Sequence, residues 1–370
     1  MRTLVLITLL VLPTVPAAAA EQTEKHTVDH QIVTRGLEHP WSLAFLPDGR
    51  FLVTERPGRL RVIGADGRLL TEPVAGLPEI AARGQGGLLD VVLHPAFEEN
   101  RWVYLSYNQP GPGGMGTAVA RGRLEGLRLH DVQVIFRLQP KSSRGQHFGS
   151  RLVFDRAGYL FITLGDRGDR PRAQDLADHA GSVIRLHDDG SVPDDNPFVD
   201  HPGARPEIFS YGHRNIQGAT LHPVTGRLWT HEHGPQGGDE INLPEPGVNY
   251  GWPVITYGVN YGIGTPIGEG TEKPGMAQPL YYWVPSIAPS GMAFYQGDRF
   301  PRWQGDLFIG SLKFRLLVRL RLHDGRVVHE ERMLEDTLGR IRDVRLGPDG
   351  HLYLLTDADD GMLVRLVPES

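Results

Sequence analysis

The stretch VFDRAGYLFITLGD, residues 153–166, contains two short apolar runs separated by a turn at residues 156–158. Runs rich in Phe, Leu, Ile and Thr on either side of such a turn are typical of a β-hairpin. His147 precedes the first run and Asp166 follows the second. Because the start and the end of an antiparallel hairpin share one edge, we expect these two side chains to lie together at one rim of a sheet.

The same hairpin pattern occurs six times along the chain, with starts 48, 61, 67, 74 and 51 residues apart. A propeller blade takes about 40–50 residues, so the longer intervals indicate insertions in the middle blades. The pattern predicts an all-β fold, a six-bladed β-propeller formed as one domain by residues 21–370. A β-sandwich is the alternative, but its strands would not recur at a blade-length interval. The copies are AFLPDGRFLVTER (44–56), VLHPAFEENRWVYLSY (92–107), VFDRAGYLFITLGD (153–166), TLHPVTGRLWTHEHG (220–234), FYQGDRFPRWQGDLFIGSL (294–312) and RLGPDGHLYLLTDADDG (345–361).

Composition narrows the classes of function. The chain has 38 Lys+Arg and 44 Asp+Glu, a formal net charge of −6, so no excess of basic charge indicates a nucleic-acid partner. The absence of cysteine excludes disulfides, thiol catalysis and cysteine-ligated metals. The 46 glycines and 29 prolines favour many tight turns. A helix is expected only from Ala173 to about Leu186, as an insertion after the third hairpin.

The first 20 residues have the pattern of an export signal. They contain Arg2, an apolar run over residues 4–12 and a small-residue cleavage site that ends at Ala20. A membrane anchor is the alternative, but Pro13 and Pro16 interrupt a run that is already short for a membrane span. We therefore expect signal peptide cleavage near Ala20 and a periplasmic or secreted protein without a membrane span.

Charged and amide side chains recur at the open ends of the hairpins. Gln85, His147, Arg214 and Arg340 lie 10, 9, 9 and 8 residues before their turns. In a propeller with equivalent blades, these ends gather at one mouth of the central channel and predict a polar pocket there. A salt-bridge network that closes the channel is the alternative. The ring also includes Asp166, Asn215, Lys313 and Arg342.

This ring favours an anionic ligand and a proton transfer. Arginine matches carboxylates in two-point contacts, so four cations at one mouth suit a compact polyanion. His147 beside Asp166 has the arrangement of a general base with an orienting carboxylate. No serine or threonine nucleophile is evident near it, which favours proton abstraction over acyl transfer. The four cations are Arg214, Lys313, Arg340 and Arg342.

The segment HGPQGGDEINLPEPGVNYGWP, residues 233–253, is rich in oxygen donors. Its glycines and prolines leave carbonyls unpaired, and Asp239 and Glu240 add carboxylates. This donor set suits a hard cation such as Ca²⁺. An acidic surface loop is the alternative interpretation of the segment.

Four weaker signals point to ordinary structure. GPGGMG (111–116) matches a dinucleotide-binding pattern but opens no helix, so a loop between strands is favoured. DADDG (357–361) lacks the distal Glu of a calcium loop and is interpreted as a solvated turn. RGD at 167–169 is too short to indicate adhesion. His231 and His233 lack a third ligand for a metal, so packing or pocket lining is expected.

At these residues the chain resembles the pyrroloquinoline quinone (PQQ)-dependent soluble aldose sugar dehydrogenases of the glucose/sorbosone dehydrogenase family. The resemblance covers nearly all of the mature chain, and the family fold is the six-bladed propeller. It implies oxidation of aldose sugars at C1 to lactones, with hydride transfer to PQQ and electrons passed to an external electron acceptor. The shared strings are GQGGLLDV, HFGSRL, LGDRGD, GHRNIQG, EHGPQGGDEIN, NYGWP and SLKF.

The resemblance also implies the roles of individual residues. His147 would be the general base that takes the proton of the anomeric hydroxyl, and Asp166 would orient it. The residues that would hold PQQ are Gln85, Arg214, Asn215, Tyr261, Lys313, Arg340 and Arg342.

Calcium ligands are implied in the same way. The carbonyls of Gly234 and Pro235 would bind the Ca²⁺ that polarises the quinone. Glu240 and Tyr250 match a second calcium site of the aldose dehydrogenase branch.

Two departures from the family pattern bear on substrate and assembly. Ser150 stands where related sequences often have a second glycine. The chain also lacks the long insertions of the larger dimeric glucose-preferring enzymes, which implies a broad range of mono- and disaccharides and a monomer or weak dimer. Two alternatives remain, a calcium-dependent propeller lactonase and a non-catalytic carbohydrate-binding propeller.

Overall fold

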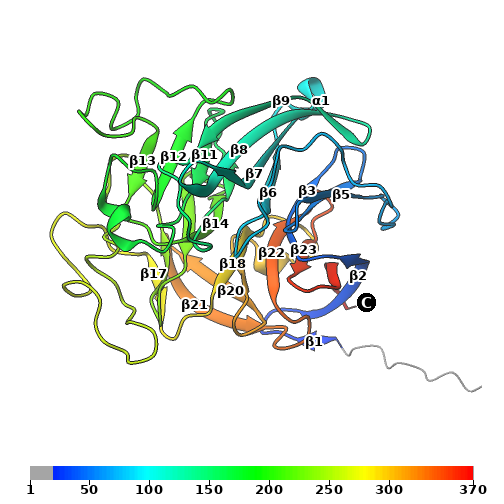
Figure 1. The fold of residues 1–370 in the computed structure, drawn as a ribbon. Helices are drawn as coiled ribbons and strands as arrows, with labels where there is room; N and C mark the ends of the chain where they lie inside the picture. The colour runs from blue at the N-terminus through cyan, green and yellow to red at the C-terminus, as the bar shows by residue number, and fades with distance from the viewer. Residues whose placement is uncertain (1–19, 370) are drawn as a thin grey trace, which may run out of the picture.

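Six antiparallel sheets surround a common axis in the computed structural model, which describes residues 20–369 (Figure 1). The predicted six-bladed β-propeller is thereby confirmed. Each predicted hairpin forms the first two strands of a blade. These pairs are β3 (Pro40–Phe45) with β4 (Phe51–Glu55), β6 (Leu88–Leu93) with β7 (Trp102–Gly111), β10 (Leu152–Phe154) with β11 (Leu160–Thr163), β14 (Ile216–Leu221) with β15 (Leu228–Glu232), β18 (Pro289–Phe294) with β19 (Leu307–Ser311), and β22 (Ile341–Leu346) with β23 (Leu352–Thr356).

Outer strands complete the blades, and only short helical turns interrupt them. The helical turns are α1 (Phe97–Asn100), η1 (Arg170–Gln174) and η2 (Pro301–Trp303). The outer strands are β5 (Arg59–Ile63), β8 (Gly114–Glu125), β9 (Arg128–Arg137), β12 (Ser182–Leu186), β13 (Ile208–Tyr211), β16 (Asp239–Asn242), β17 (Tyr281–Trp283), β20 (Leu317–His323) and β21 (Arg326–Met333).

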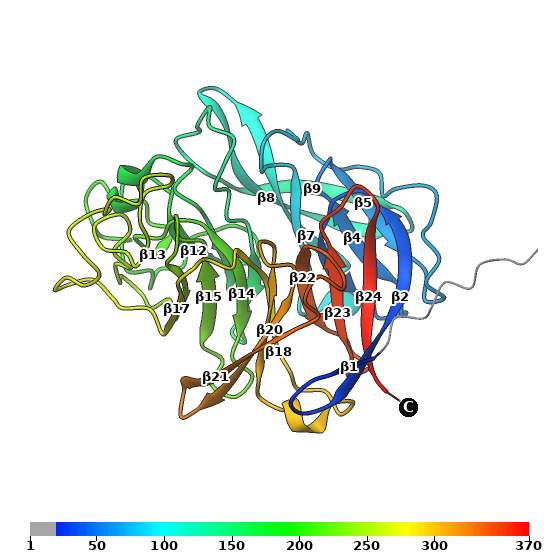
Figure 2. The same ribbon diagram turned by 90° about the horizontal axis from the view of Figure 1, so that it is seen from below.

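The two ends of the described chain close the ring in one blade. The last strand, β24 (Gly361–Pro368), pairs with β2 (Thr27–Leu37), and β1 (Glu21–Gln22) adds to the outer edge. Figure 2 shows β24 and β2 side by side. Because this pairing joins the first and last parts of the sequence in one blade, it closes the ring.

The innermost strands of the blades contact one another in a ring, and charged residues fill the space between them. Arg151 Nη1 lies 2.9 Å from Asp343 Oδ1, and Arg345 Nη2 lies 2.9 Å from Asp90 Oδ1. The side chains of Asp90, Arg151 and Asp343 are buried, and that of Arg345 is 22% exposed. We call Asp90, Arg151, Asp343 and Arg345 the channel cluster.

One local prediction was wrong. In place of a helix over residues 173–186, the chain has the short turn η1 and then β12, the third strand of its blade. Gly181 has φ of +68°, which a helix cannot continue. The β-branched Val183 and Ile184 are fully buried, so packing in the sheet decides the conformation.

Two other predictions concern the ends and loops of the chain. The glycine-rich stretch at 111–116 is the tip of the β7–β8 hairpin, as predicted. The predicted export signal lies outside the described residues, apart from Ala20. Between residues 20 and 369, no helix has the length and apolar character needed to cross a membrane.

Candidate functional site

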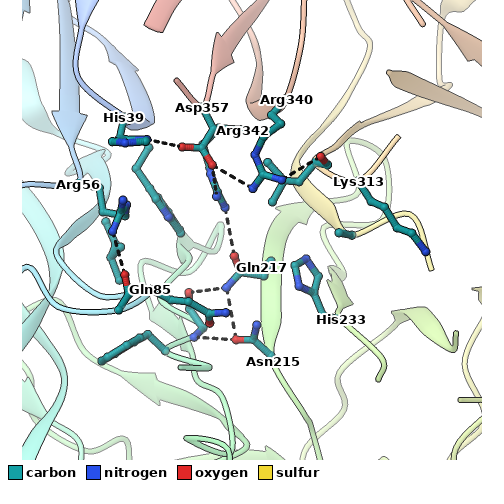
Figure 3. Close-up of a pocket in the computed structure, with 17 residues that line it drawn as sticks. His39, Arg56, Gln85, Asn215, Gln217, His233, Lys313, Arg340, Arg342 and Asp357 are labelled. Atoms are coloured by element: carbon teal, nitrogen blue, oxygen red, sulfur yellow. Dashed lines mark hydrogen bonds and ion pairs between the residues drawn. The ribbon is translucent and has the colours of Figure 1, made fainter. Parts of the chain in front are cut away.

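A cavity of about 810 Å³ lies at one mouth of the ring of inner strands. Its walls come from segments that precede the first strands or follow the second strands of the hairpins. The open ends of the blades therefore gather at one mouth, as the repeat predicted. The lining residues labelled in Figure 3 are His39, Arg56, Gln85, Asn215, Gln217, His233, Lys313, Arg340, Arg342 and Asp357.

Positive charge predominates on the cavity wall. Four cations line the cavity together with a single carboxylate, Asp357. Arg342 Nη2 lies 2.8 Å and Arg340 Nη2 lies 3.2 Å from Asp357 Oδ2. Between residues 20 and 369, neither Arg56 nor Lys313 forms an ion pair with a carboxylate, so the wall keeps a net positive charge suited to an anion.

The ionisation of Asp357 follows from its neighbours. Burial acts to raise the pKa of Asp357, but the positive charges of Arg342 and Arg340 outweigh it. His39 Nδ1 also lies 2.9 Å from Asp357 Oδ1. These contacts hold the pKa well below its ordinary value, so Asp357 is ionised at neutral pH.

Amide groups and apolar rings complete the cavity. Gln217 Nε2 donates to the Gly149 carbonyl at 3.3 Å, and Arg342 Nη1 donates to Gln217 Oε1 at 3.4 Å. Trp41 and Phe148 provide an apolar surface in the same cavity. Charged groups beside flat apolar surface suit a planar polyanion.

His147 and Asp166 meet beside this cavity, as the hairpin predicted. His147 Nδ1 lies 2.6 Å from Asp166 Oδ1, and Trp252 Nε1 donates to the second carboxylate oxygen at 2.8 Å. The His147 backbone N–H donates to Gln85 Oε1 at 2.9 Å, which links His147 to the cavity wall. Phe148 and Gly149, the next two residues, line the cavity.

The protonation states favour a neutral imidazole facing a carboxylate. Burial lowers the pKa of His147 below its ordinary value. Burial acts to raise the pKa of Asp166, but the hydrogen bond from His147 outweighs it and the pKa lies below its ordinary value. With Nδ1–H donated to Asp166, Nε2 is left as the acceptor, and within residues 20–369 it forms no hydrogen bond.

Two residues predicted to hold a cofactor do not line the cavity. Arg214 donates from Nη1 to the carbonyls of His233 at 2.8 Å and Gly234 at 2.6 Å. Tyr261 is 66% exposed on a loop. The roles implied for both residues stay predictions, as do those of the predicted residues that line the cavity, namely Gln85, Asn215, Lys313, Arg340 and Arg342.

Three of the four predicted metal ligands line a very small void of about 10 Å³. Gly234, Glu240 and Tyr250 line it together with Glu232, whereas the Pro235 carbonyl only accepts from Ser286 Oγ at 3.5 Å. Burial and the neighbouring Glu232 raise the pKa of Glu240 well above its ordinary value. A cation would relieve this repulsion, and the oxygen donors suit Ca²⁺. Among residues 20–369, no three His, Cys, Asp or Glu side chains are grouped to hold a metal.

Sequence reasoning missed several residues of the cavity. Arg56 and Asp357 follow the second strands of the first and last blades, where Asp166 stands in its own blade, so the repeat could have identified them. The interpretation of 357–361 as a solvated turn was wrong for Asp357, whose side chain is 10% exposed and ion-paired. His233 lines the cavity and His231 is fully buried, which confirms the prediction of pocket lining and packing.

Comparisons with known proteins agree with this geometry. Aldose sugar dehydrogenase YliI of Escherichia coli (strain K12) is 50% identical over 349 residues, which cover 93% of this chain and 94% of that protein. The soluble aldose sugar dehydrogenase from Escherichia coli in the apo-form has a crystal structure with a TM-score of 0.90 at 49% identity, covering 93% of this chain and all of that one. The PQQ-bound form of aldose sugar dehydrogenase from Streptomyces coelicolor has a TM-score of 0.75 at 27% identity, covering 94% and 100%.

The family model described as Glucose / Sorbosone dehydrogenase matches residues 37–365, which is most of the chain and includes every wall of the cavity. The relatives named above are dehydrogenases of sugars. This chain belongs to the glucose/sorbosone dehydrogenase family.

Proposed function

We propose that this protein oxidises aldose sugars at C1 to lactones with bound PQQ and calcium. The observation that carries the proposal is a cavity whose wall combines four cations with one carboxylate, next to the His147–Asp166 pair. The PQQ-bound Streptomyces coelicolor relative supports the choice of cofactor.

The cavity residues fit PQQ by charge and shape. PQQ is a planar tricarboxylate, and the cavity offers cationic side chains, amides and the aromatic surface of Trp41 and Phe148. When bound, PQQ supplies an ortho-quinone that accepts hydride from the sugar. The lining residues that would hold it are Gln85, Asn215, Lys313, Arg340 and Arg342, with Arg56 and Gln217 added by the structure.

His147 would move the proton. Its Nε2 is the acceptor left when Nδ1–H is donated to Asp166, so it would take the proton of the anomeric hydroxyl as hydride leaves C1. Asp166 would stabilise the imidazolium that forms. Trp252 holds the other carboxylate oxygen and thereby fixes the direction of Asp166.

Calcium would be held by backbone and side-chain oxygens of the 233–253 segment. The Gly234 and Pro235 carbonyls would serve the cation beside the cofactor, and Glu240 and Tyr250 a second cation. An added Cβ at Gly234 would lie 2.2 Å from the Gly238 carbonyl oxygen, so only glycine fits this turn. Arg214, which donates to the Gly234 carbonyl, would position this segment against the cavity.

The remaining parts of the proposal concern the substrates, the electron acceptor, the location and the oligomeric state of the protein. The substrates would be mono- and disaccharides, and an external acceptor would take the electrons. We also propose a periplasmic or secreted protein, produced by cleavage near Ala20, that is a monomer or weak dimer.

The test is to mix purified cofactor-free protein with PQQ and Ca²⁺ and to follow the absorbance of the cofactor while an aldose is added. Stoichiometric binding and sugar-dependent reduction are expected. A chain that binds PQQ but does not reduce it with any aldose would contradict the proposed reaction. Failure to bind PQQ would contradict the cofactor, and lactone hydrolysis without PQQ would indicate a lactonase.

A further inference from the structure

Arg167 is a buried cation at the open end of the hairpin formed by β10 and β11. Its side chain is fully buried, and it takes part in none of the ion pairs among residues 20–369. Burial lowers the pKa of Arg167 to about 9. Burying a guanidinium costs free energy unless its N–H groups donate hydrogen bonds. The burial of Arg167 therefore indicates a specific role for this side chain.

All of its polar and aromatic contacts lie in the segment that carries His147. Arg167 Nη2 donates to the Arg144 carbonyl at 2.6 Å, and Nη1 donates to the Gln146 carbonyl. The guanidinium carbon lies 3.5 Å from the centroid of the Phe148 ring. Arg144 in turn donates from its guanidinium to the Gly168 carbonyl. The two loops are therefore joined by contacts in both directions.

The backbone at His147 needs such support. His147 has φ of +54°, in the left-handed region that side chains with a Cβ rarely adopt. This conformation costs about 1–3 kcal/mol and persists only where surrounding contacts determine it. On the cavity side, the Gln85 N–H donates to the Gly145 carbonyl at 2.8 Å and Gln85 Oε1 accepts from the His147 N–H. On the other side, the contacts come from Arg167.

We propose that Arg167 is a positioning residue for His147. Its guanidinium clamps residues 144–148 against the loop that follows β11, so that the imidazole meets Asp166, the residue directly before Arg167 in the chain. The inference deepens the proposed function, on which it rests for the role of His147. Arg167 is buried and does not line the cavity, so it acts on His147 through the loop and through its charge, without touching substrate or cofactor.

The shape of the arginine side chain suits position 167 in two ways. A planar fork reaches two carbonyls, at residues 144 and 146, while its face lies on an aromatic ring. Lysine retains the charge but presents a single ammonium, which cannot make the same paired contacts over Phe148. A Lys variant therefore separates the geometry of the clamp from its charge.

The charge has a separate effect on His147. The charged groups that face the imidazole are Asp166, Arg214 and Arg167. The two arginines favour the neutral imidazole and Asp166 favours the protonated one. Removing the charge of Arg167 should therefore raise the pKa of His147, whereas Arg167→Lys should leave it nearly unchanged.

The experiment compares Arg167→Lys and Arg167→Met with Arg185→Met. Arg185 is a matched control because it lies on β12 of the same blade, also buried, with its guanidinium carbon 3.9 Å from the Tyr159 ring centroid. Three quantities are measured: kcat and KM for an aldose, the titration of the His147 imidazole by NMR in cofactor-free protein with His147→Gln for assignment, and hydrogen exchange of the 144–148 amides.

Both Arg167 variants should lose roughly 10–100-fold in kcat with little change in KM, since a displacement of about 1 Å at a reacting group can cost 100-fold. Both should show faster exchange of the 144–148 amides, and only Arg167→Met should raise the His147 pKa. The Arg185 variant should change none of these.

If both Arg167 variants show the hydrogen exchange of the 144–148 amides and the His147 titration of the wild type, the proposed clamp is wrong. If Arg167→Met does not fold, Arg167→Lys alone tests the clamp, because lysine keeps a positive charge and a single donor nitrogen at this position. If the wild type does not turn over with PQQ, the proposed function fails, but the NMR and exchange measurements still decide the role of Arg167.

Discussion

Charged side chains cluster in two regions of the propeller, and the two regions differ in the ratio of cations to carboxylates. In the channel cluster, two arginines face two aspartates. Backbone N–H groups of Leu152 and Leu43 also donate to Asp90 Oδ2 at 2.8 Å and to Asp343 Oδ2 at 3.1 Å. At the mouth, four cations and one carboxylate line a cavity of about 810 Å³. A balanced cluster stabilises the fold, whereas an unbalanced one is suited to bind an anion.

The sequence left two interpretations of the charged ring, a ligand pocket and a salt-bridge network that closes the channel. The structure contains a buried ion-pair cluster on the inner strands and an open cationic cavity at the mouth, and a ligand for that cavity stays a prediction. The channel cluster lies on the inner strands β6 and β22 and directly before β10. The cationic wall lies at the mouth, where the hairpins open.

The largest expected difference between the two regions lies in turnover. His147→Ala, at the mouth, should lower kcat by about 10²–10⁴-fold, the usual contribution of a general base, while PQQ binding and stability are retained. Steady-state rates with an aldose and a PQQ titration measure this. His130→Ala is the control, since His130 is exposed on β9, and it should keep wild-type turnover. A similar kcat in both variants would contradict the role of His147.

The next effect concerns the channel cluster. Asp343→Ala leaves the buried Arg151 and the partly exposed Arg345 with Asp90 as their only partner in the cluster, and breaking a buried pair costs about 3–5 kcal/mol. Urea denaturation of the cofactor-free protein should show this loss. Glu269→Ala, which removes an exposed ion pair with Lys273, should cost at most about 1 kcal/mol. Equal losses in the two variants would mean that the cluster is not a structural element.

A smaller change is expected for a cation of the mouth. Lys313→Met removes a charge that forms no ion pair within the described part of the chain, so the free energy of unfolding should hardly change. The affinity for PQQ should fall about 10–150-fold, which corresponds to about 1.5–3 kcal/mol for a charged hydrogen bond. Fluorescence titration measures the Kd. Lys273→Met, an exposed lysine outside the cavity, should bind like the wild type, and an unchanged Kd for Lys313→Met would place the anion elsewhere.

The smallest effect is a pH dependence at the mouth. Because the pKa of Asp357 is lower in the folded than in the unfolded protein, the unfolded chain takes up a proton first as the pH falls below the ordinary value of 3.8. The stability that Asp357 contributes is thus present at neutral pH and is lost in acid. Asp357→Asn should therefore lower the stability at pH 7 and flatten the decline below pH 4, measured by urea denaturation at several pH values. An unchanged acid slope would show that Asp357 does not contribute in this way.

The sequence predicted the architecture of the fold better than the conformation of individual segments. Hairpin turns are local, so the six repeats and the juxtaposition of His147 with Asp166 could be read from residues near in sequence. The expected helix at 173–186 was wrong because the burial of Val183 and Ile184 between strands depends on partners distant in the chain. Asp357 was misread because spacing does not show that the hairpin of β22 and β23 returns it to Arg342 and Arg340, 15 and 17 residues earlier, or that His39, 318 residues away, lies beside it.

The sequence by itself therefore determined the number of blades, their all-β character and the recurrence of polar groups at one edge of each hairpin. These properties depend on turn chemistry and on the two-residue period of strands, which are local. Only the tertiary structure decided which cations are neutralised and which face open space. It directs Arg214 to the Gly234 carbonyl, places Asp357 among the arginines and seats Arg167 behind His147. These contacts join residues 15 to 23 positions apart at the open end of a single hairpin, and they depend on side-chain directions and loop conformations that spacing along the chain does not encode.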